Sequence, residues 1–183
     1  MTERASTLTR NLLFGATAVL SIALDQWTKI LARTHLRPIE VYGGHKTVIP
    51  NYFDLRFSEN TGVAFGMFQN LPGGKYLLSL VGLLALGLVV YYLLKSGPRQ
   101  TRLHLALGLI FGGAVGNLVD RVFLSKVTDF IVWHVGRHEW PAFNVADAAL
   151  VVGVGLMALD MLFDRRGHTA PAAPPDSAGS KEA

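Results

Sequence analysis

Two aspartates, Asp129 and Asp147, are the residues whose type and position best fit chemistry. Asp129 lies just before an amphipathic connector, and Asp147 lies just inside the apolar run 143–163. An ionised Asp at the centre of an inserted helix costs about 2.5–3.5 kcal/mol, so its presence requires a reason. Two carboxylates that approach each other cannot both ionise easily, and one of them keeps its proton. Such a pair can take a proton from water and donate another to a scissile carbonyl oxygen.

A structural interpretation of the same two residues is also open. In it Asp147 caps a helix or pairs with Arg121, and Asp129 is an ordinary loop acid. In the catalytic interpretation the two carboxyls titrate as a unit, which leaves both assignments of acid and base open.

The composition is that of a membrane protein. Half of the 183 residues are hydrophobic and only 16% are charged, and the apolar residues come in long blocks. There is no Cys, which excludes disulfides, thiol nucleophiles and thiolate metal sites. The net charge of +4 comes from basic residues scattered at the ends of apolar blocks, a distribution that argues against nucleic-acid binding.

Four apolar segments are long enough to cross a bilayer. We predict spans at about residues 11–32, 76–94, 103–124 and 143–163. A cleaved signal peptide is the alternative for the first segment, because basic residues precede it. Asp25 and Lys29, four residues apart on one helix face, are followed by further apolar residues and favour an uncleaved helix.

The third span carries a stripe of small residues. Gly108, Gly112 and Gly116 recur every four residues, so they share one helix face and allow another helix to approach closely.

Residues 33–75 are rich in Gly and Pro, and within them 53–58 alternates apolar and polar residues with the period of a half-buried strand. We predict a small extramembrane sheet that packs on the helices, followed by a turn at Asn60, Thr61 and Gly62. The tail 168–183 is rich in Pro, Ala and Ser and is predicted to be disordered. Residues 1–167 are thus expected to form one membrane domain, with 33–75 as its sheet.

The distribution of cations predicts the orientation. The short loop between the second and third spans contains Lys95, Arg99 and Arg102, which marks it and both termini as cytoplasmic. Counting residues along each span then brings the polar side chains to one outer level, with Asp160 as the exception. The side chains at that level are Asp25, Asn117, Arg121, Asn144 and Asp147, next to Asp129 in the outer connector.

Each supporting residue has a plain alternative. For Asp25, the nearby Lys29 favours a structural ion pair over a third catalytic acid. Arg121 can hold a carboxylate, a carbonyl or a lipid headgroup. Asn144, three residues before Asp147, can orient the Asp147 carboxylate.

Three further sites remain open or are disfavoured. Asp120 is read as an interfacial residue beside Arg121. Asn60 and Gly62 are either ordinary turn residues or part of a loop over the site. The pattern His134-x-x-x-His138-Glu139 has the wrong order for a zinc helix, so no metal is predicted.

Two competing functions use the same features. A small transporter or proton relay would use Asp25, Arg121 and Asp147, but the inner halves of the spans are nearly all apolar. A non-enzymatic assembly factor would use the glycine stripe for helix pairing.

Five motifs in order resemble those of lipoprotein signal peptidase (signal peptidase II), over about residues 11–163. They are Asp25-Gln26-x-x-Lys29, Asn60-x-Gly62-x-Ala64-Phe65, Gly112-Gly113-Ala114-x-Gly116-Asn117-x-x-Asp120-Arg121, Val127-x-Asp129-Phe130 and Phe143-Asn144-x-Ala146-Asp147. Val63 and Ala148 depart from the Ala and Ser that the pattern usually has there, and neither change removes a catalytic group.

The resemblance implies an integral membrane, mainly α fold, with four transmembrane helices, a periplasmic β-sheet cradle and a short periplasmic connector helix. It implies a bacterial inner-membrane aspartic endopeptidase that removes the signal peptide of diacylglyceryl-modified prolipoproteins just before the lipidated Cys, at the periplasmic side. Partners would be these substrates and membrane lipids, with no cofactor; the protein would be a monomer and would bind globomycin-type inhibitors. The implied catalytic pair is Asp129 and Asp147, supported by Asp25, Asn60, Gly62, Asn117, Arg121 and Asn144.

Overall fold

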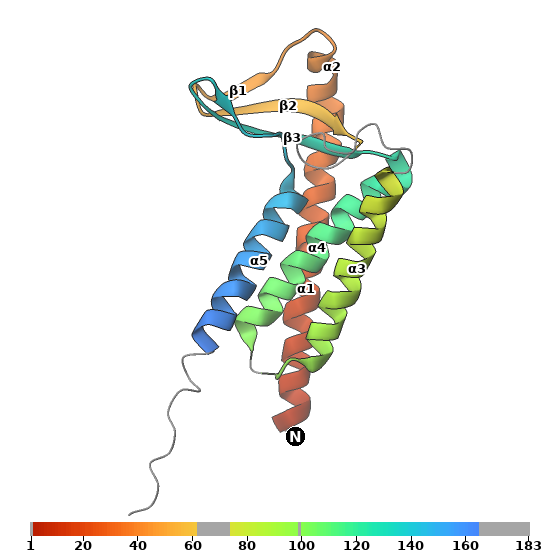
Figure 1. Cartoon of the computed structure of the whole chain (residues 1–183), viewed down its shortest axis with the longest axis vertical. Coiled ribbons are helices and arrows are strands. Elements are labelled where there is room, and N and C mark those ends of the chain that lie inside the picture. Colours follow the sequence, from red (N-terminus) through yellow and green to blue (C-terminus); the bar gives the residue numbers. More distant parts are fainter. Residues whose placement is uncertain (1, 62–73, 99, 165–183) are drawn as a thin grey trace, which may run out of the picture.

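The computed structural model of the chain describes residues 2–61, 74–98 and 100–164. Four long helices run side by side, and a small sheet lies across one end of the bundle (Figure 1). The helices are α1 (Thr2–Leu31), α3 (Gly74–Lys95), α4 (Thr101–Leu124) and α5 (Val145–Asp164). Among the described residues these 4 helices are long and apolar enough to cross a membrane, which confirms the four predicted spans.

The first helix extends well beyond its predicted span. It begins at Thr2 and continues without interruption into the π-helical turn η1 (Ala32–Leu36) and the short helix α2 (Arg37–Glu40). Pro38 lies in the first turn of α2, where its missing N–H costs little. Figure 1 shows this extension reaching past the bundle to the sheet.

Helix α4 packs against the other three helices of the bundle. A Cβ atom on Gly112 would lie 2.6 Å from the Ser21 Cβ on α1, and one on Gly108 would lie 2.8 Å from the Thr17 Cβ. The predicted close approach along the glycine stripe is therefore confirmed, with α1 as the partner. Gly113, outside the stripe, does the same for α5, because its Cβ would lie 2.5 Å from the Ala146 carbonyl oxygen.

The sheet has four antiparallel strands in the order β1-β2-β3-β4. They are β1 (Lys46–Ile49), β2 (Phe53–Asn60), β3 (Val127–Val135) and β4 (His138–Glu139). The register of β2 and β3 shifts between Leu55 and Ser58, directly beside Asp129, which opposes Ser58. Bulges of this kind commonly re-aim a side chain next to a functional site.

Two details of the sheet prediction were wrong. Segment 33–75 supplies only β1 and β2, while β3 and β4 come from the connector between α4 and α5. The connector between α4 and α5 contains strands, and the short helical pieces outside the bundle, among the described residues, are η1 and α2, which continue α1. Residues 62–73, between β2 and α3, lie outside the described ranges. Asn60 is the last residue of β2 instead of a turn residue, and Gly62 lies outside the described residues, as does the tail 168–183.

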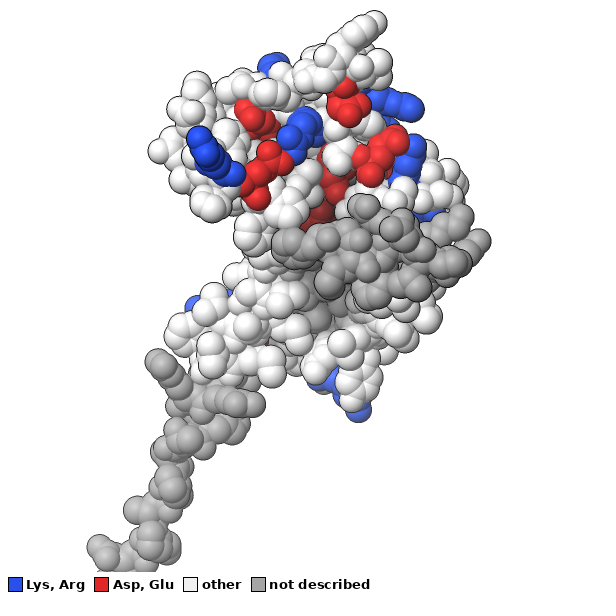
Figure 2. Space-filling model, turned by 45° about the horizontal axis from the view of Figure 1, so that its top comes forward, with Lys and Arg blue, Asp and Glu red and all other residues white. Residues whose placement is uncertain are grey.

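A small apolar cluster fixes the sheet on the bundle. Ala32 and Leu36 of η1 pack with Phe57 of β2 and Phe130 of β3. Charged side chains gather at this sheet end, and the flanks of the helices visible in Figure 2 are nearly uncharged. Arg56 pairs with Glu139 across the strands. The sheet end therefore has the surface of a water-facing element, on a bundle whose flanks suit lipid.

Candidate active site

The carboxyls of Asp129 and Asp147 are linked through one buried residue, Asn144. The Asn144 Nδ2 donates to the Asp129 Oδ1 at 2.7 Å, and the Asn144 backbone N–H donates to the Asp147 Oδ2 at 3.2 Å. Asp129 projects from β3 and Asp147 from the first turn of α5, so one strand and one helix end supply the two carboxyls. The two predicted residues are thus brought together at the junction of sheet and bundle.

The position of Asp147 follows from how α5 begins. Asn144 precedes the first helical residue, and its Oδ1 accepts the Asp147 N–H at 3.0 Å. The Asp147 carboxylate accepts the Asn144 N–H in return. This reciprocal pair is a capping box, which satisfies two N–H groups that the helix itself leaves without partners. The structural alternative for Asp147, a helix cap, is therefore present, and the same bonds hold the carboxylate in place.

Asp129 is nearly inaccessible, with 3% of its surface exposed. The Asn60 Nδ2 donates to its Oδ2 at 3.1 Å, opposite the bond from Asn144. Burial, with the negative charge of Asp147 as the second cause, raises the pKa of Asp129 to about 6, although the bonds from Asn60 and Asn144 act to lower it. Burial therefore favours the protonated form of Asp129.

Asn117 of α4 connects the pair to the bundle. Its Nδ2 donates to the Asp147 Oδ1 at 2.8 Å, and its Oδ1 accepts from the Asn144 Nδ2 at 3.1 Å. The Lys29 Nζ donates to the same Oδ1 at 3.0 Å. With two donors on the oxygen side and a carboxylate on the nitrogen side, the orientation of this amide is determined by its neighbours.

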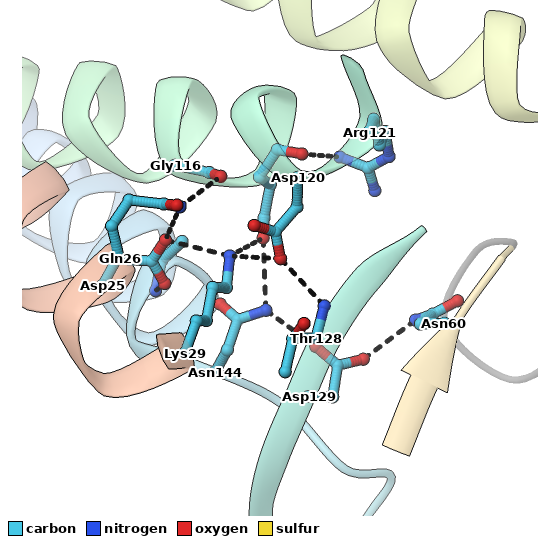
Figure 3. Close-up of polar contacts among 12 residues, drawn as sticks. Asp25, Gln26, Lys29, Asn60, Gly116, Asp120, Arg121, Thr128, Asp129 and Asn144 are labelled. Carbon is cyan, nitrogen blue, oxygen red and sulfur yellow. Dashed lines mark hydrogen bonds and ion pairs between the residues drawn. The ribbon is translucent and has the colours of Figure 1, made fainter. Parts of the chain in front are cut away.

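Lys29 is the centre of the buried polar network (Figure 3). Its side chain is completely buried, and its Nζ lies 2.9 Å from the Asp25 Oδ2 and 3.5 Å from the Asp120 Oδ2. The predicted ion pair of Asp25 and Lys29 is confirmed. A buried ammonium needs several acceptors to offset its lost hydration, and this one has three.

Comparisons with known proteins agree on one family. A family model described as "Signal peptidase (SPase) II" matches residues 17–163. A lipoprotein signal peptidase of Symbiobacterium thermophilum is 38% identical over 153 residues, which cover 84% of this chain and 96% of the relative. Another, of Geobacter metallireducens, is 40% identical over 154 residues, with 84% and 93% covered. A solved bacterial membrane enzyme matches with a TM-score of 0.72 at 30% identity, covering 81% of this chain and 92% of that one.

The chain belongs to the signal peptidase II family. The resemblance drawn from the five motifs is thereby confirmed, and with it the class of a membrane protease. The two competing functions, a transporter and a non-enzymatic assembly factor, fall outside the protease class that this family indicates.

Among the described residues, Asp25 contacts Lys29, Gln26 and the Ala146 N–H. Its Oδ1 accepts the Ala146 N–H at 2.9 Å, at the first turn of α5, where a carboxylate is favourable. The Gln26 Nε2 donates both to the Asp25 Oδ2 and to the Gly116 carbonyl oxygen, each at 3.0 Å. Asp25 thus joins α1 to the beginning of α5.

Of the three kinds of partner considered for Arg121, the structure shows a carbonyl oxygen, that of Asn117. Its Nη1 lies 3.4 Å from the Asn117 carbonyl oxygen, and within the described part of the chain it forms no ion pair within 4 Å. Its side chain is half-buried beside the two carboxyls.

Asp120 was misjudged as an interfacial residue. It is 1% exposed, and its Oδ2 accepts the Thr128 N–H at 2.9 Å. Thr128 lies only eight residues after Asp120, but the sequence did not identify it as a strand residue, so this contact was not predicted. His134, considered as a metal ligand, lies 3.0 Å from Asp54 instead, and no three metal-ligating side chains converge in the described ranges.

Proposed function

We propose that this signal peptidase II is an aspartic endopeptidase in which Asp129 and Asp147 activate water. Its substrates are diacylglyceryl-modified prolipoproteins, and it cuts just before the lipidated Cys to release the signal peptide. The observation that carries the proposal is the placement of two carboxyls, one buried and one half-buried, on the same Asn144 side chain and backbone.

The electrostatics favour a proton on Asp129 up to about pH 6. Burial raises the pKa of Asp129 to about 6, and the charge of Asp147 adds to the rise. A carboxylate and a carboxylic acid side by side are what general base and general acid catalysis on a peptide require.

The reaction then follows the usual course for a pair of this kind. The ionised carboxyl takes a proton from water, which attacks the scissile carbonyl carbon while the protonated carboxyl donates to the carbonyl oxygen. The gem-diol then collapses: the carboxyl that took the proton from water passes it to the leaving amine, the other carboxylate takes a proton from a gem-diol hydroxyl, and the C–N bond breaks. No metal, cofactor or covalent enzyme adduct takes part in these steps.

The supporting residues have separate tasks in this scheme. Asn60, Asn117 and Asn144 donate to the two carboxyls and fix their orientation. Asp25 positions the start of α5 through the Ala146 N–H. Arg121, whose guanidinium donates to the Asn117 carbonyl oxygen and forms no ion pair with a described residue, is available to a carbonyl group of the substrate.

The location of the site suits a lipid-linked substrate. We assign residues 1–167 to one membrane domain of the inner membrane, with both termini cytoplasmic and the sheet periplasmic. The two carboxyls lie where the bundle meets the sheet, so the acyl chains of a substrate stay in lipid while the scissile bond reaches water. The enzyme acts as a monomer and is inhibited by globomycin-type cyclic peptides.

The deciding experiment measures turnover of a diacylglyceryl-modified prolipoprotein by the purified protein in detergent. Asp129→Asn and Asp147→Asn each remove one ionisable carboxyl while keeping its shape, so each should lower kcat by about 10³-fold or more. Asp54→Asn on the outer part of the sheet is the control and should keep full activity. Cleavage by either dyad variant at a rate near that of wild type would refute the proposal.

The orientation has its own test, which the lack of native Cys makes simple. A single Cys at Thr47 in β1 should react with a membrane-impermeant maleimide added outside spheroplasts. A single Cys at Gly97, between α3 and α4, should react only after lysis. The opposite pattern would invert the proposed topology.

A further inference from the structure

Arg33 makes the contacts of a positioning residue, although none of the five motifs includes it. It lies in the π-helical turn η1, directly above the buried Lys29 on the same continuous helix. π-Helical turns are rare and are frequently found at functional sites. Here the turn places the Arg33 guanidinium beside Asp120 of α4 and Thr128 of β3.

The contacts of Arg33 form a closed three-residue unit. Its Nη1 donates to the Thr128 Oγ1 at 2.9 Å and lies 3.4 Å from the Asp120 Oδ1. The third side is the bond from the Thr128 N–H to the other oxygen of Asp120. A strand, a helix of the bundle and the extension of α1 are thereby tied together at one point.

Burial makes this unit more than a surface contact. Asp120 and Thr128 are 1% and 2% exposed, and the Arg33 side chain is 25% exposed. Two buried carboxylates, Asp25 and Asp120, face two cations, Lys29 and Arg33. Without Arg33, two buried carboxylates would face the single cation Lys29. The less compensated carboxylate would be Asp120, because the Lys29 Nζ lies closer to Asp25 than to Asp120.

Thr128 is the residue immediately before Asp129. Both of its ties, through the hydroxyl to Arg33 and through the N–H to Asp120, fix the peptide that leads into Asp129. Asp129 itself is held between Asn60 and Asn144 with bonds of 3.1 and 2.7 Å, which tolerate little displacement.

We propose that Arg33 is a positioning residue of this enzyme: through Thr128 and Asp120 it fixes the start of β3 and so holds Asp129 in register with Asn144 and Asp147. The inference rests on the proposed catalytic pair. Arg33 touches neither carboxyl of that pair, so its action is on geometry alone.

The test compares Arg33→Met and Thr128→Val with wild type, by kcat, KM and the pH dependence of kcat/KM on a lipidated prolipoprotein. Thr128→Val keeps the β-branched shape and the backbone N–H and removes only the hydroxyl. Both variants should lower kcat, Arg33→Met by about tenfold, with KM unchanged, because a misplaced catalytic group costs rate and not binding. Both should also move the high-pH limb upward, since Asp129 would lose part of its bonds to Asn60 and Asn144. Arg33→Lys, which retains the charge, should recover part of the rate.

Arg37→Met and Thr34→Val are matched controls on the same helix. Arg37 lies over the Phe57 ring, and the Thr34 hydroxyl donates to the Ile30 carbonyl oxygen, so neither touches Asp120 or Thr128. Both should retain the kcat and the pH profile of wild type. A wild-type kcat and pH profile in Arg33→Met and Thr128→Val, or a change in melting temperature alone, would overturn the inference. If Asp129→Asn is active in the same assay, it is the catalytic pair that fails, which separates the two results.

Discussion

Helices α3 and α4 are neighbours of similar length, but α4 is largely buried by the rest of the protein and α3 is largely exposed on its surface. Half of the α4 span is buried, against 6% of the α3 span, although α3 is the more apolar of the two. The buried helix is the one with Asn117, Asp120 and glycines that α1 and α5 approach closely, whereas Gly82 and Gly87 of α3 meet no such neighbour among the described residues. In a bilayer, apolar side chains gain nothing by leaving lipid, so small and polar side chains mark the buried faces.

The largest effect on stability should come from replacing Lys29, the buried cation that contacts Asn117 and Asp120 at the polar end of α4. Lys29→Met leaves Asp25 and Asp120 buried with too little positive charge, and breaking a buried pair in this way costs about 3–5 kcal/mol. We expect this loss in the free energy of unfolding in detergent. The double variant with Asp25→Asn should recover part of it. Unfolding of Lys29→Met as for wild type would show that the network contributes little to stability.

The close approach along α4 provides the next test. Gly112→Ala places a Cβ 2.6 Å from the Ser21 Cβ and 2.9 Å from the Ala18 carbonyl oxygen, so α1 must move. Overpacking of this kind costs about 1–3 kcal/mol. Gly82→Ala on α3 is the matched control, because its Cβ would meet no atom of the described residues within 4 Å. Thermal unfolding of the two variants measures the difference, and equal melting temperatures would contradict a tight α1–α4 contact.

The pH dependence of the activity tests the chemical side of the contrast, because the proposed pair on β3 and α5 is bonded to Asn117 of α4. The pKa of Asp129 is raised to about 6, so its proton is lost as the pH rises through that value, and kcat/KM should fall there. Asn60→Ala removes a hydrogen bond that lowers this pKa, so the limb should move to higher pH. The same raised pKa means that the fold gains stability as the pH falls from above 6 towards 3.8. A limb that Asn60→Ala leaves in place or moves to lower pH would contradict this assignment.

The smallest effect is expected on the lipid-facing side of α3. Leu84 is 65% exposed within the protein, so Leu84→Ala should change the free energy of unfolding by less than about 0.5 kcal/mol. Leu107→Ala on α4, where the side chain is 1% exposed, should cost about 2 kcal/mol or more because it leaves a cavity. Similar costs for the two would mean that α3 has a packing partner on its outer face.

The sequence predicts those features of the fold and site that depend only on the spacing of residues within one segment. The four spans, the glycine stripe and the pair of Asp25 and Lys29 follow from helical spacing and length. The pairing of β2 with β3 does not, because Asn60 opposes Val127 across two intervening spans. The first residues of β3 are buried on both faces, so they lack the alternation that identifies a strand. The roles of Asp120, Thr128 and Arg33 depend on that pairing, so they emerged only with the structure.

That pairing also has a consequence for synthesis. β2 is made before α3 and α4, and β3 after them, so the sheet cannot close until the helical hairpin between the strands has entered the membrane. Asn144 and Asp147 come later still, at the start of the last helix. A growing chain therefore has neither the completed sheet nor the second carboxyl. In the proposed mechanism both carboxyls are needed, so the enzyme gains its activity only once its own insertion is finished.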